Sequence, residues 1–124
     1  MQLNYRLHDR IRYKTWVKLV PMRGEGLLSH IEDISSDGLG VEHERPLDID
    51  SECHLYFMLP LAGREHIIQA RCRVASCFPV EVPGRYHIGL AFESFVSDPR
   101  ETSALIESFI QHNMQQPDPS QAPQ

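Results

Sequence analysis

The stretch Asp33-Ile34-Ser35-Ser36-Asp37-Gly38 decides how the rest of the chain is arranged. It separates two strand-like runs, residues 27–31 and 39–41, and therefore predicts a strand end, a tight turn and the start of the next strand. We expect Gly38 to supply a positive φ in this turn. Strand residues two apart share a face, so Asp33 and Ser35 should be presented side by side, with Ile34 on the opposite face.

An arginine pair lies one strand upstream of this turn. Arg6 and Arg10 have the spacing Arg-x-x-x-Arg and directly precede the first strand-like run. Each pattern is weak alone, because Ser, Asp and Gly are ordinary turn residues and short motifs recur by chance. Their order and spacing together are harder to obtain by accident.

With these residues the chain resembles the PilZ domain family, bacterial receptors for the second messenger cyclic di-GMP. The family's Arg-x-x-x-Arg arm and [Asp/Asn]-x-Ser-x-x-Gly strand end are matched by Arg6, Arg10, Asp33, Ser35 and Gly38. Residues 89–92 resemble the Gly-x-x-Phe segment of the family's last barrel strand, so the resemblance covers most of residues 5–113. One position departs from the pattern: many members carry an arginine directly before the pair, where this chain has Tyr5.

The resemblance implies ligand recognition by the five motif residues, with no catalytic residue, metal or cofactor. Guanidinium groups bind phosphate oxygens or the O6 and N7 edge of guanine and stack on bases, which suits Arg6 and Arg10. The Asp33 carboxylate can accept the guanine N1 and N2 hydrogens, Ser35 can add a hydroxyl, and Gly38 leaves room for the ligand. Further candidates are Tyr5, Arg12, Arg71 and Arg73.

The strand pattern predicts an all-β fold, a six-stranded antiparallel PilZ-type β-barrel with a C-terminal α-helix. Short alternating runs with turns between them are typical of a small closed barrel, which has no exposed edges. We place the first strand at residues 13–20 and a loop, with two prolines, at residues 78–84. Asp98, Pro99 and Glu101 predict the start of the helix, and its apolar stripe is expected to pack on the barrel. The stripe consists of Leu105, Ile106, Phe109 and Ile110.

The chain divides into three predicted parts. Residues 1–12 form a flexible basic arm that carries the arginine motif and folds over the barrel when ligand binds. Residues 13–114 form the barrel and helix, and residues 115–124, with three prolines, form a disordered tail. Because 124 residues leave no room for an output domain, an unidentified effector protein is expected to read the bound state. We expect a monomer or a weak homodimer.

Charge and composition narrow the class of partner. The net charge is −5, yet residues 1–23 hold six Arg or Lys against one Asp, which gives +5 there and −10 elsewhere. This distribution favours a small anion over a nucleic-acid polymer. The chain lacks an apolar stretch for membrane insertion and a secretory signal, so we expect a cytoplasmic protein. Three cysteines without framework spacing predict reduced thiols.

Three other functions stay open. The domain could be a PilZ-like adaptor between proteins that does not bind nucleotide, which Tyr5 permits. A hydrolase using Ser35, His30 and Asp33 is conceivable, although simple alternation places His30 and Ser35 on opposite faces. A barrel for single-stranded nucleic acid would need several aromatics in a basic groove, and only Trp16 between Lys14 and Lys18 resembles that pattern.

Overall fold

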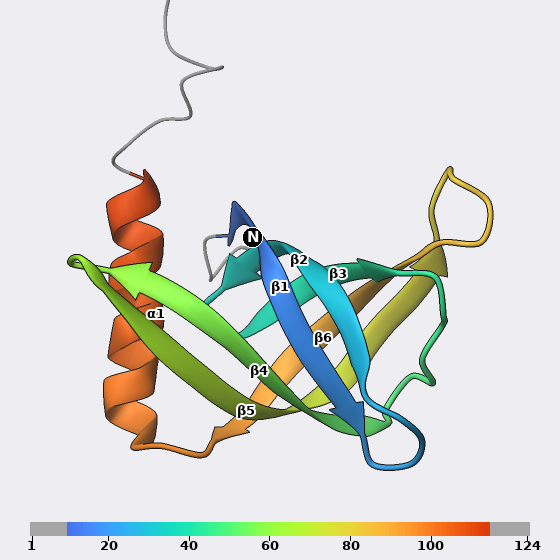
Figure 1. The fold of residues 1–124 in the computed structure, drawn as a ribbon, viewed down its shortest axis with the longest axis horizontal. Helices are drawn as coiled ribbons and strands as arrows, with labels where there is room; N and C mark the ends of the chain where they lie inside the picture. The colour runs from blue at the N-terminus through green and yellow to red at the C-terminus, as the bar shows by residue number, and fades with distance from the viewer. Residues whose placement is uncertain (1–9, 115–124) are drawn as a thin grey trace, which may run out of the picture.

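Six antiparallel strands close into a barrel in the order β1-β2-β3-β6-β5-β4, and one helix lies against it (Figure 1). The computed structural model describes residues 10–114. The elements are β1 (Arg10–Pro21), β2 (Leu27–Ser35), β3 (Gly38–His43), β4 (Glu52–Leu61), β5 (Arg64–Pro79), β6 (Tyr86–Phe95) and α1 (Pro99–Met114). The predicted fold is confirmed. No helix in residues 10–114 is long and apolar enough to cross a membrane.

Alternating side chains of every strand fill the inside of the barrel. On β4, Leu55, Phe57 and Leu59 are buried, and the corresponding positions of the other strands meet them. Cys53 and Cys72 lie opposite each other across β4 and β5, and both are buried as free thiols. Burial raises the pKa of the Cys53 thiol to about 11 and raises that of Cys72 as well.

Two strands are longer than the sequence predicts. β1 begins at Arg10, where it pairs with Ser35 of β2, so the boundary predicted after residue 12 falls inside β1. The reason is that β2 continues far enough to pair with residues 10–12, and Ile11 packs against the core. β5 runs on to Pro79, past the predicted loop start at residue 78. Residues 1–9 and 115–124, which hold the rest of the predicted arm and the predicted tail, lie outside the described residues.

A β-bulge at Glu32 changes the alternation of β2. Ile31 pairs with Val41 and Asp33 pairs with Gly40, so Glu32 is an extra residue relative to β3. Ile31 and Ile34 are therefore both buried in the core although they are three residues apart. Residues after the bulge point to the opposite side from the one that strict alternation along β2 predicts.

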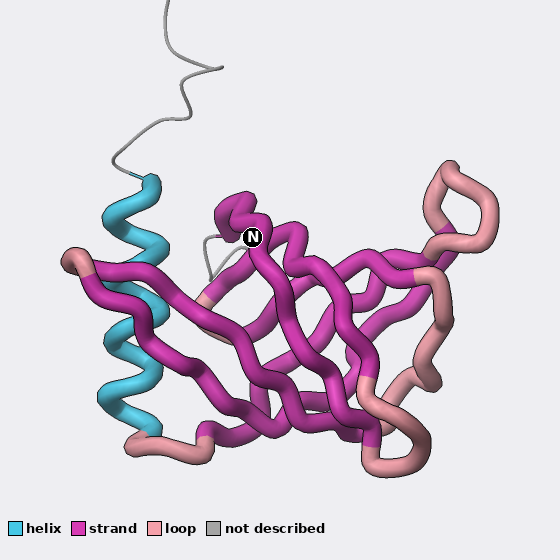
Figure 2. The backbone as a smooth tube through the Cα atoms, viewed as in Figure 1, coloured by secondary structure: helices cyan, strands magenta, loops and turns pink. Residues whose placement is uncertain are grey.

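The helix starts and packs as predicted. The Asp98 carboxylate accepts hydrogen bonds from the backbone N–H of Arg100 (2.9 Å) and Glu101 (3.1 Å). Ile106, Phe109 and Ile110 are buried against the barrel, and Leu105 is partly buried. Figure 2 shows the β4–β5 hairpin beside α1, while the β3–β4 and β5–β6 connections lie at the other end of the barrel.

Candidate functional site

The β1–β2 ladder brings Arg10 to the strand end that the sequence singles out. Arg10 lies opposite Ser35 and Arg12 lies opposite Asp33. The Arg10 Nη1 donates to Asp33 Oδ1, forming an ion pair whose two side chains are 46% and 23% exposed. The second arginine and the carboxylate of the motif are therefore in direct contact and both reach solvent.

Asp33 lies over the backbone of β3, next to a histidine from β6. A Cβ placed on Gly40 would lie 2.7 Å from Asp33 Oδ1 and 3.0 Å from His87 Cε1. The absence of a side chain at Gly40 thus creates the space that both groups occupy. The His87 ring also packs on Phe78, with 5.2 Å between ring centroids, and Phe78 is 51% exposed. An aromatic surface therefore lies beside the carboxylate.

Ser35 is placed differently from the prediction. Its side chain is 1% exposed, and its hydroxyl donates to Asp37 Oδ1 and, at 3.4 Å, to the Gly38 carbonyl. Asp33 and Ser35 flank the core residue Ile34 and share the face opposite to it, as expected. The Ser35 hydroxyl is nevertheless not presented to solvent beside Asp33, because the Ser35–Gly38 turn buries it and provides its hydrogen-bond acceptors. In this structure Ser35 fixes the turn between β2 and β3.

Gly38 is required for a reason other than the one predicted. The described glycines with positive φ are Gly24, Gly63 and Gly84, so the expectation of a positive φ at Gly38 is wrong. A Cβ on Gly38 would instead overlap the Leu90 carbonyl oxygen and lie 3.1 Å from the Leu90 carbonyl carbon. Gly38 therefore permits the close approach of β3 to β6 at the strand end.

A shallow depression of about 210 Å³ adjoins Arg10 and this turn. Its floor consists of small residues from three neighbouring strands, with Arg10 and Asp37 as its charged members. The small residues are Gly38, Ala75, Ser76, Gly89 and Ala91. Such a surface leaves room for a flat ring beside a cation.

Arg71 and Arg73 are held in a separate ion cluster on β4, β5 and β6. Arg73 donates to Glu93 (2.8 Å), to Glu52 (3.3 Å) and to the Asp50 carbonyl (3.0 Å). The bond to Glu93 is the main cause of its raised pKa. Arg71 lies within 4.0 Å of the same two glutamates. These arginines are already matched by carboxylates, whereas Arg12 forms no ion pair with another residue of the described part of the chain.

Two candidate ligand residues, Tyr5 and Arg6, lie outside residues 10–114. The described part of the motif therefore consists of Arg10, Asp33, Ser35 and Gly38. Of these, Arg10 and Asp33 face solvent, while Ser35 and Gly38 shape the turn beneath them.

The family model described as PilZ domain matches residues 4–111. This match spans the arginine pair, the β2–β3 turn, the whole barrel and most of α1. The chain belongs to the PilZ domain family. No match to a curated protein was found.

Several solved structures share this barrel at low sequence identity. The Bacillus subtilis inhibitor of motility MotI/DgrA has a TM-score of 0.77 at 16% identity, over 94% of this chain and 55% of that protein. K. pneumonia MrkH in complex with c-di-GMP has a TM-score of 0.66 at 20% identity, over 91% of this chain and 54% of that protein. Borreliella burgdorferi PlzA in complex with c-di-GMP has a TM-score of 0.54 at 13% identity, over 92% of this chain and 54% of that protein. The chain thus spans about half the length of these proteins.

Sequence reasoning missed Gly40, Ala75, Ser76 and His87 at the site. Small residues occupy every second position on β3 (Gly38 and Gly40) and on β6 (Gly89 and Ala91). This spacing is visible in the sequence and indicates a strand face without large side chains. That these two strands are neighbours, with Gly40 opposite Gly89, follows only from the barrel order. Nothing in the sequence singles out His87, because its position near Asp33 depends on the pairing of β3 with β6.

The structure argues against the hydrolase alternative, but for a different reason from the alternation of faces used in the sequence analysis. The bulge at Glu32 places His30 and Ser35 on the same outer face, so the expectation of opposite faces is wrong. Five residues of strand nevertheless separate them by about 16 Å. His30 stacks on Trp16, with ring centroids 3.7 Å apart, and Ser35 bonds to Asp37. Among residues 10–114, no group of three His, Cys, Asp or Glu side chains could hold a metal ion.

Proposed function

We propose that this protein is a receptor for cyclic di-GMP that passes the signal to an effector protein. The observation that carries the proposal is the solvent-facing Arg10–Asp33 pair beside a depression floored by small residues. A guanine base offers an O6 and N7 edge to a guanidinium and two N–H donors to a carboxylate. The family membership and the similarity of this fold to MrkH and PlzA, both solved in complex with c-di-GMP, support the same ligand.

Each motif residue has a distinct role in this proposal. Arg10 binds a phosphate or a guanine edge, and Asp33 accepts the guanine N–H groups. Ser35 and Gly38 act as positioning residues, because one holds Asp37 and the turn and the other allows close strand approach. Arg6 supplies the second guanidinium, and Tyr5 and Arg12 are the nearest further candidates along the chain.

Signalling would follow from the attachment of Arg6 and Arg10 to one ligand. Arg10 belongs to β1, and Arg6 precedes this strand by four residues. When both guanidinium groups hold the messenger, the residues before β1 are held over the barrel, at a cost in conformational entropy. The surface formed in this way is the part that an effector would recognise.

Calorimetric titration of cyclic di-GMP tests the assignment directly. Arg6→Ala and Arg10→Ala should each weaken binding by about 2 kcal/mol or more, because each removes charge-assisted hydrogen bonds. Arg23→Ala, an exposed arginine in the β1–β2 connection, is the matched control and should bind as the wild type does. A wild-type chain without measurable binding, or unchanged affinity in both motif variants, would remove the proposal.

An adaptor that does not bind nucleotide is the second candidate. The observation in its favour is that Asp33 already neutralises Arg10 within the protein, as Glu52 and Glu93 neutralise Arg73. The ligand would have to compete with Asp33 for the Arg10 guanidinium. The same titration separates the two functions, since an adaptor would fold normally and show no heat of binding.

A further inference from the structure

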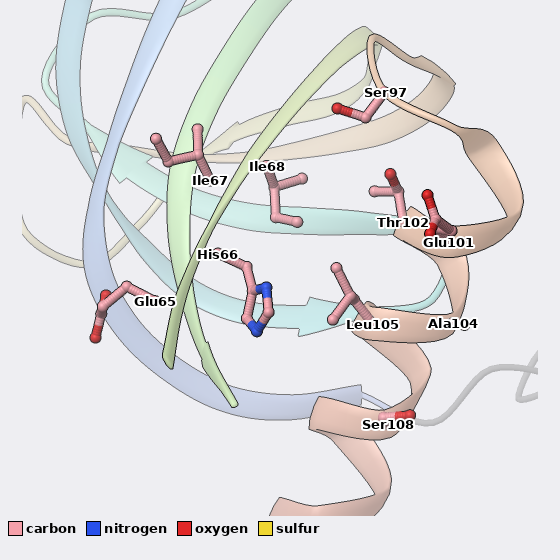
Figure 3. A pocket seen from close by; sticks show the side chains of 10 residues that line it. All are labelled: Glu65, His66, Ile67, Ile68, Ser97, Glu101, Thr102, Ala104, Leu105 and Ser108. Atoms are coloured by element: carbon pink, nitrogen blue, oxygen red, sulfur yellow. The ribbon is translucent and has the colours of Figure 1, made fainter. Parts of the chain in front are cut away.

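We propose that the groove between α1 and the free edge of β5 binds an extended basic segment of a partner protein as an added β-strand. The groove has a volume of about 680 Å³ and lies beside the β4–β5 hairpin, on α1 and the first half of β5. The Arg10 depression involves only the second half of β5, at Ala75 and Ser76. Figure 3 shows His66 and Ile68 of β5 pointing toward Leu105 and Thr102 of α1 across this space. The inference does not depend on nucleotide binding.

The first half of β5 has a neighbouring strand on one side only. Residues 64–69 pair with β4, but the pairing with β6 begins at Ala70. The last bond on the β6 side runs from the Val96 N–H to the Gln69 carbonyl (3.0 Å). Because backbone groups alternate along a strand, the N–H and C=O of Ile67 and Glu65 point to the same side as those of Gln69. They therefore form an open edge that faces the groove.

The helix does not close this edge. α1 packs on β4, β1, β2 and β6, and the groove separates it from residues 65–68 of β5. Open edges in a closed barrel are unusual, because unpaired backbone groups invite another strand. Binding of an extended peptide to such an edge is an established mode of recognition, in which pockets for alternate side chains give specificity.

The two faces of the open strand define the chemistry of the partner. On the α1 side, buried Ile68 and partly buried Leu105 form an apolar floor. On the outer side lie Glu65 and Ile67, and Glu101 lines the helix wall. Neither glutamate forms an ion pair with another residue in the described range 10–114, and the lining contains no Lys or Arg. An added strand would thus place apolar residues toward α1 and Lys or Arg residues on the outer face.

The probe is a fluorescein-labelled peptide of alternating Lys and Val, titrated into the complete protein and followed by anisotropy and by amide exchange in NMR spectra. Exposed Ala104 lines the groove, so Ala104→Trp should fill it and weaken binding at least about tenfold. Glu107→Trp, an exposed position outside the lining, is the matched control and should bind as the wild type does. Bound peptide should slow exchange of the Ile67 and Glu65 amides.

Further arms separate strand addition from simple charge attraction. A Glu-Val peptide should fail to bind because it lacks the positive charge. A Lys-Val peptide with methylated backbone nitrogens should also fail to bind, because it lacks the backbone N–H donors. Equal binding of either one, or of wild type and Ala104→Trp, would overturn the proposal. Self-association of the chain alone that Ala104→Trp abolishes would also overturn it, because the groove would then be occupied by a second copy.

Discussion

Arg10 and Asp33 form an ion pair between neighbouring strands although they are 23 positions apart in the chain. The pair depends on the length of β1, which extends to Arg10 and places it opposite Ser35. The second arginine of the motif is thus positioned by strand pairing before any ligand binds. A ligand that displaces Asp33 from Arg10 could use both groups, one for its phosphate and one for its base.

Asp33→Ala should remove the preference for guanine. The wild type is expected to bind cyclic di-GMP more tightly than cyclic di-AMP by about 1–3 kcal/mol, because only guanine offers N1 and N2 hydrogens to a carboxylate. The variant should bind the two nucleotides alike in calorimetric titrations. Raised salt should weaken the phosphate contacts of both proteins equally. Equal affinity of the wild type for both nucleotides would show that Asp33 does not read the base.

Gly38→Ala should destabilise the fold. Its Cβ would overlap the Leu90 carbonyl, a backbone group that cannot turn aside, so we expect a loss of about 1–3 kcal/mol in the free energy of unfolding. Urea denaturation measures the change. Gly26→Ala is the matched control, since its Cβ would meet no atom closer than 3.6 Å. A Gly38→Ala protein as stable as this control would mean that the strands can separate at no cost.

Gly40→Ala should impair ligand binding more than stability. The added Cβ would meet the ends of the Asp33 and His87 side chains, which can rotate away, rather than backbone atoms. Asp33 would then leave its position beside Arg10. We expect a weaker affinity for cyclic di-GMP in calorimetry and a smaller loss of stability than in Gly38→Ala. The reverse order of the two stability losses would contradict this account of the two glycines.

Stability should fall in alkaline solution because of the buried thiols. Burial raises the pKa of Cys53 from 9.0 to about 11, so the folded protein retains a proton that the unfolded chain releases. The stabilisation is complete below pH 9.0 and is lost as the pH rises toward 11, and Cys72 acts in the same direction. Urea denaturation at about pH 8 and about pH 10 measures the effect. If a Cys53→Ala, Cys72→Ala double variant loses as much stability over this interval, other groups are responsible.

One cyclic di-GMP molecule should bind per chain. In the family, an arginine directly before the motif pair is associated with capture of two intercalated messenger molecules, and this chain has Tyr5 there. Arg71 and Arg73, which could have supplied the missing charge, are matched by Glu52 and Glu93. Tyr5→Arg should shift the calorimetric stoichiometry toward two. Saturation of the wild type at two per chain would point to Arg12 as the additional cation.

The local pattern of the sequence was enough to predict the barrel and the helix. Alternation of apolar residues specifies which side of each strand is buried, because burial on one face selects residues at every second position. Asp98 and Pro99 likewise specify the helix start, because they satisfy and initiate its first turn. The motif residues could be named in advance because their types and spacing are a property of the chain itself.

Tertiary structure alone decided how these residues are used. The bulge at Glu32 depends on the register of β2 against both neighbours, and it overrides simple alternation. The roles of Gly38 and Gly40 depend on Leu90 and His87, which come from a strand more than 40 residues later in the sequence. The open edge of β5 exists because β6 ends at Phe95 and the chain turns away into α1. Such contacts between distant segments arise only when the barrel closes, because closure sets which strands become neighbours and in which register.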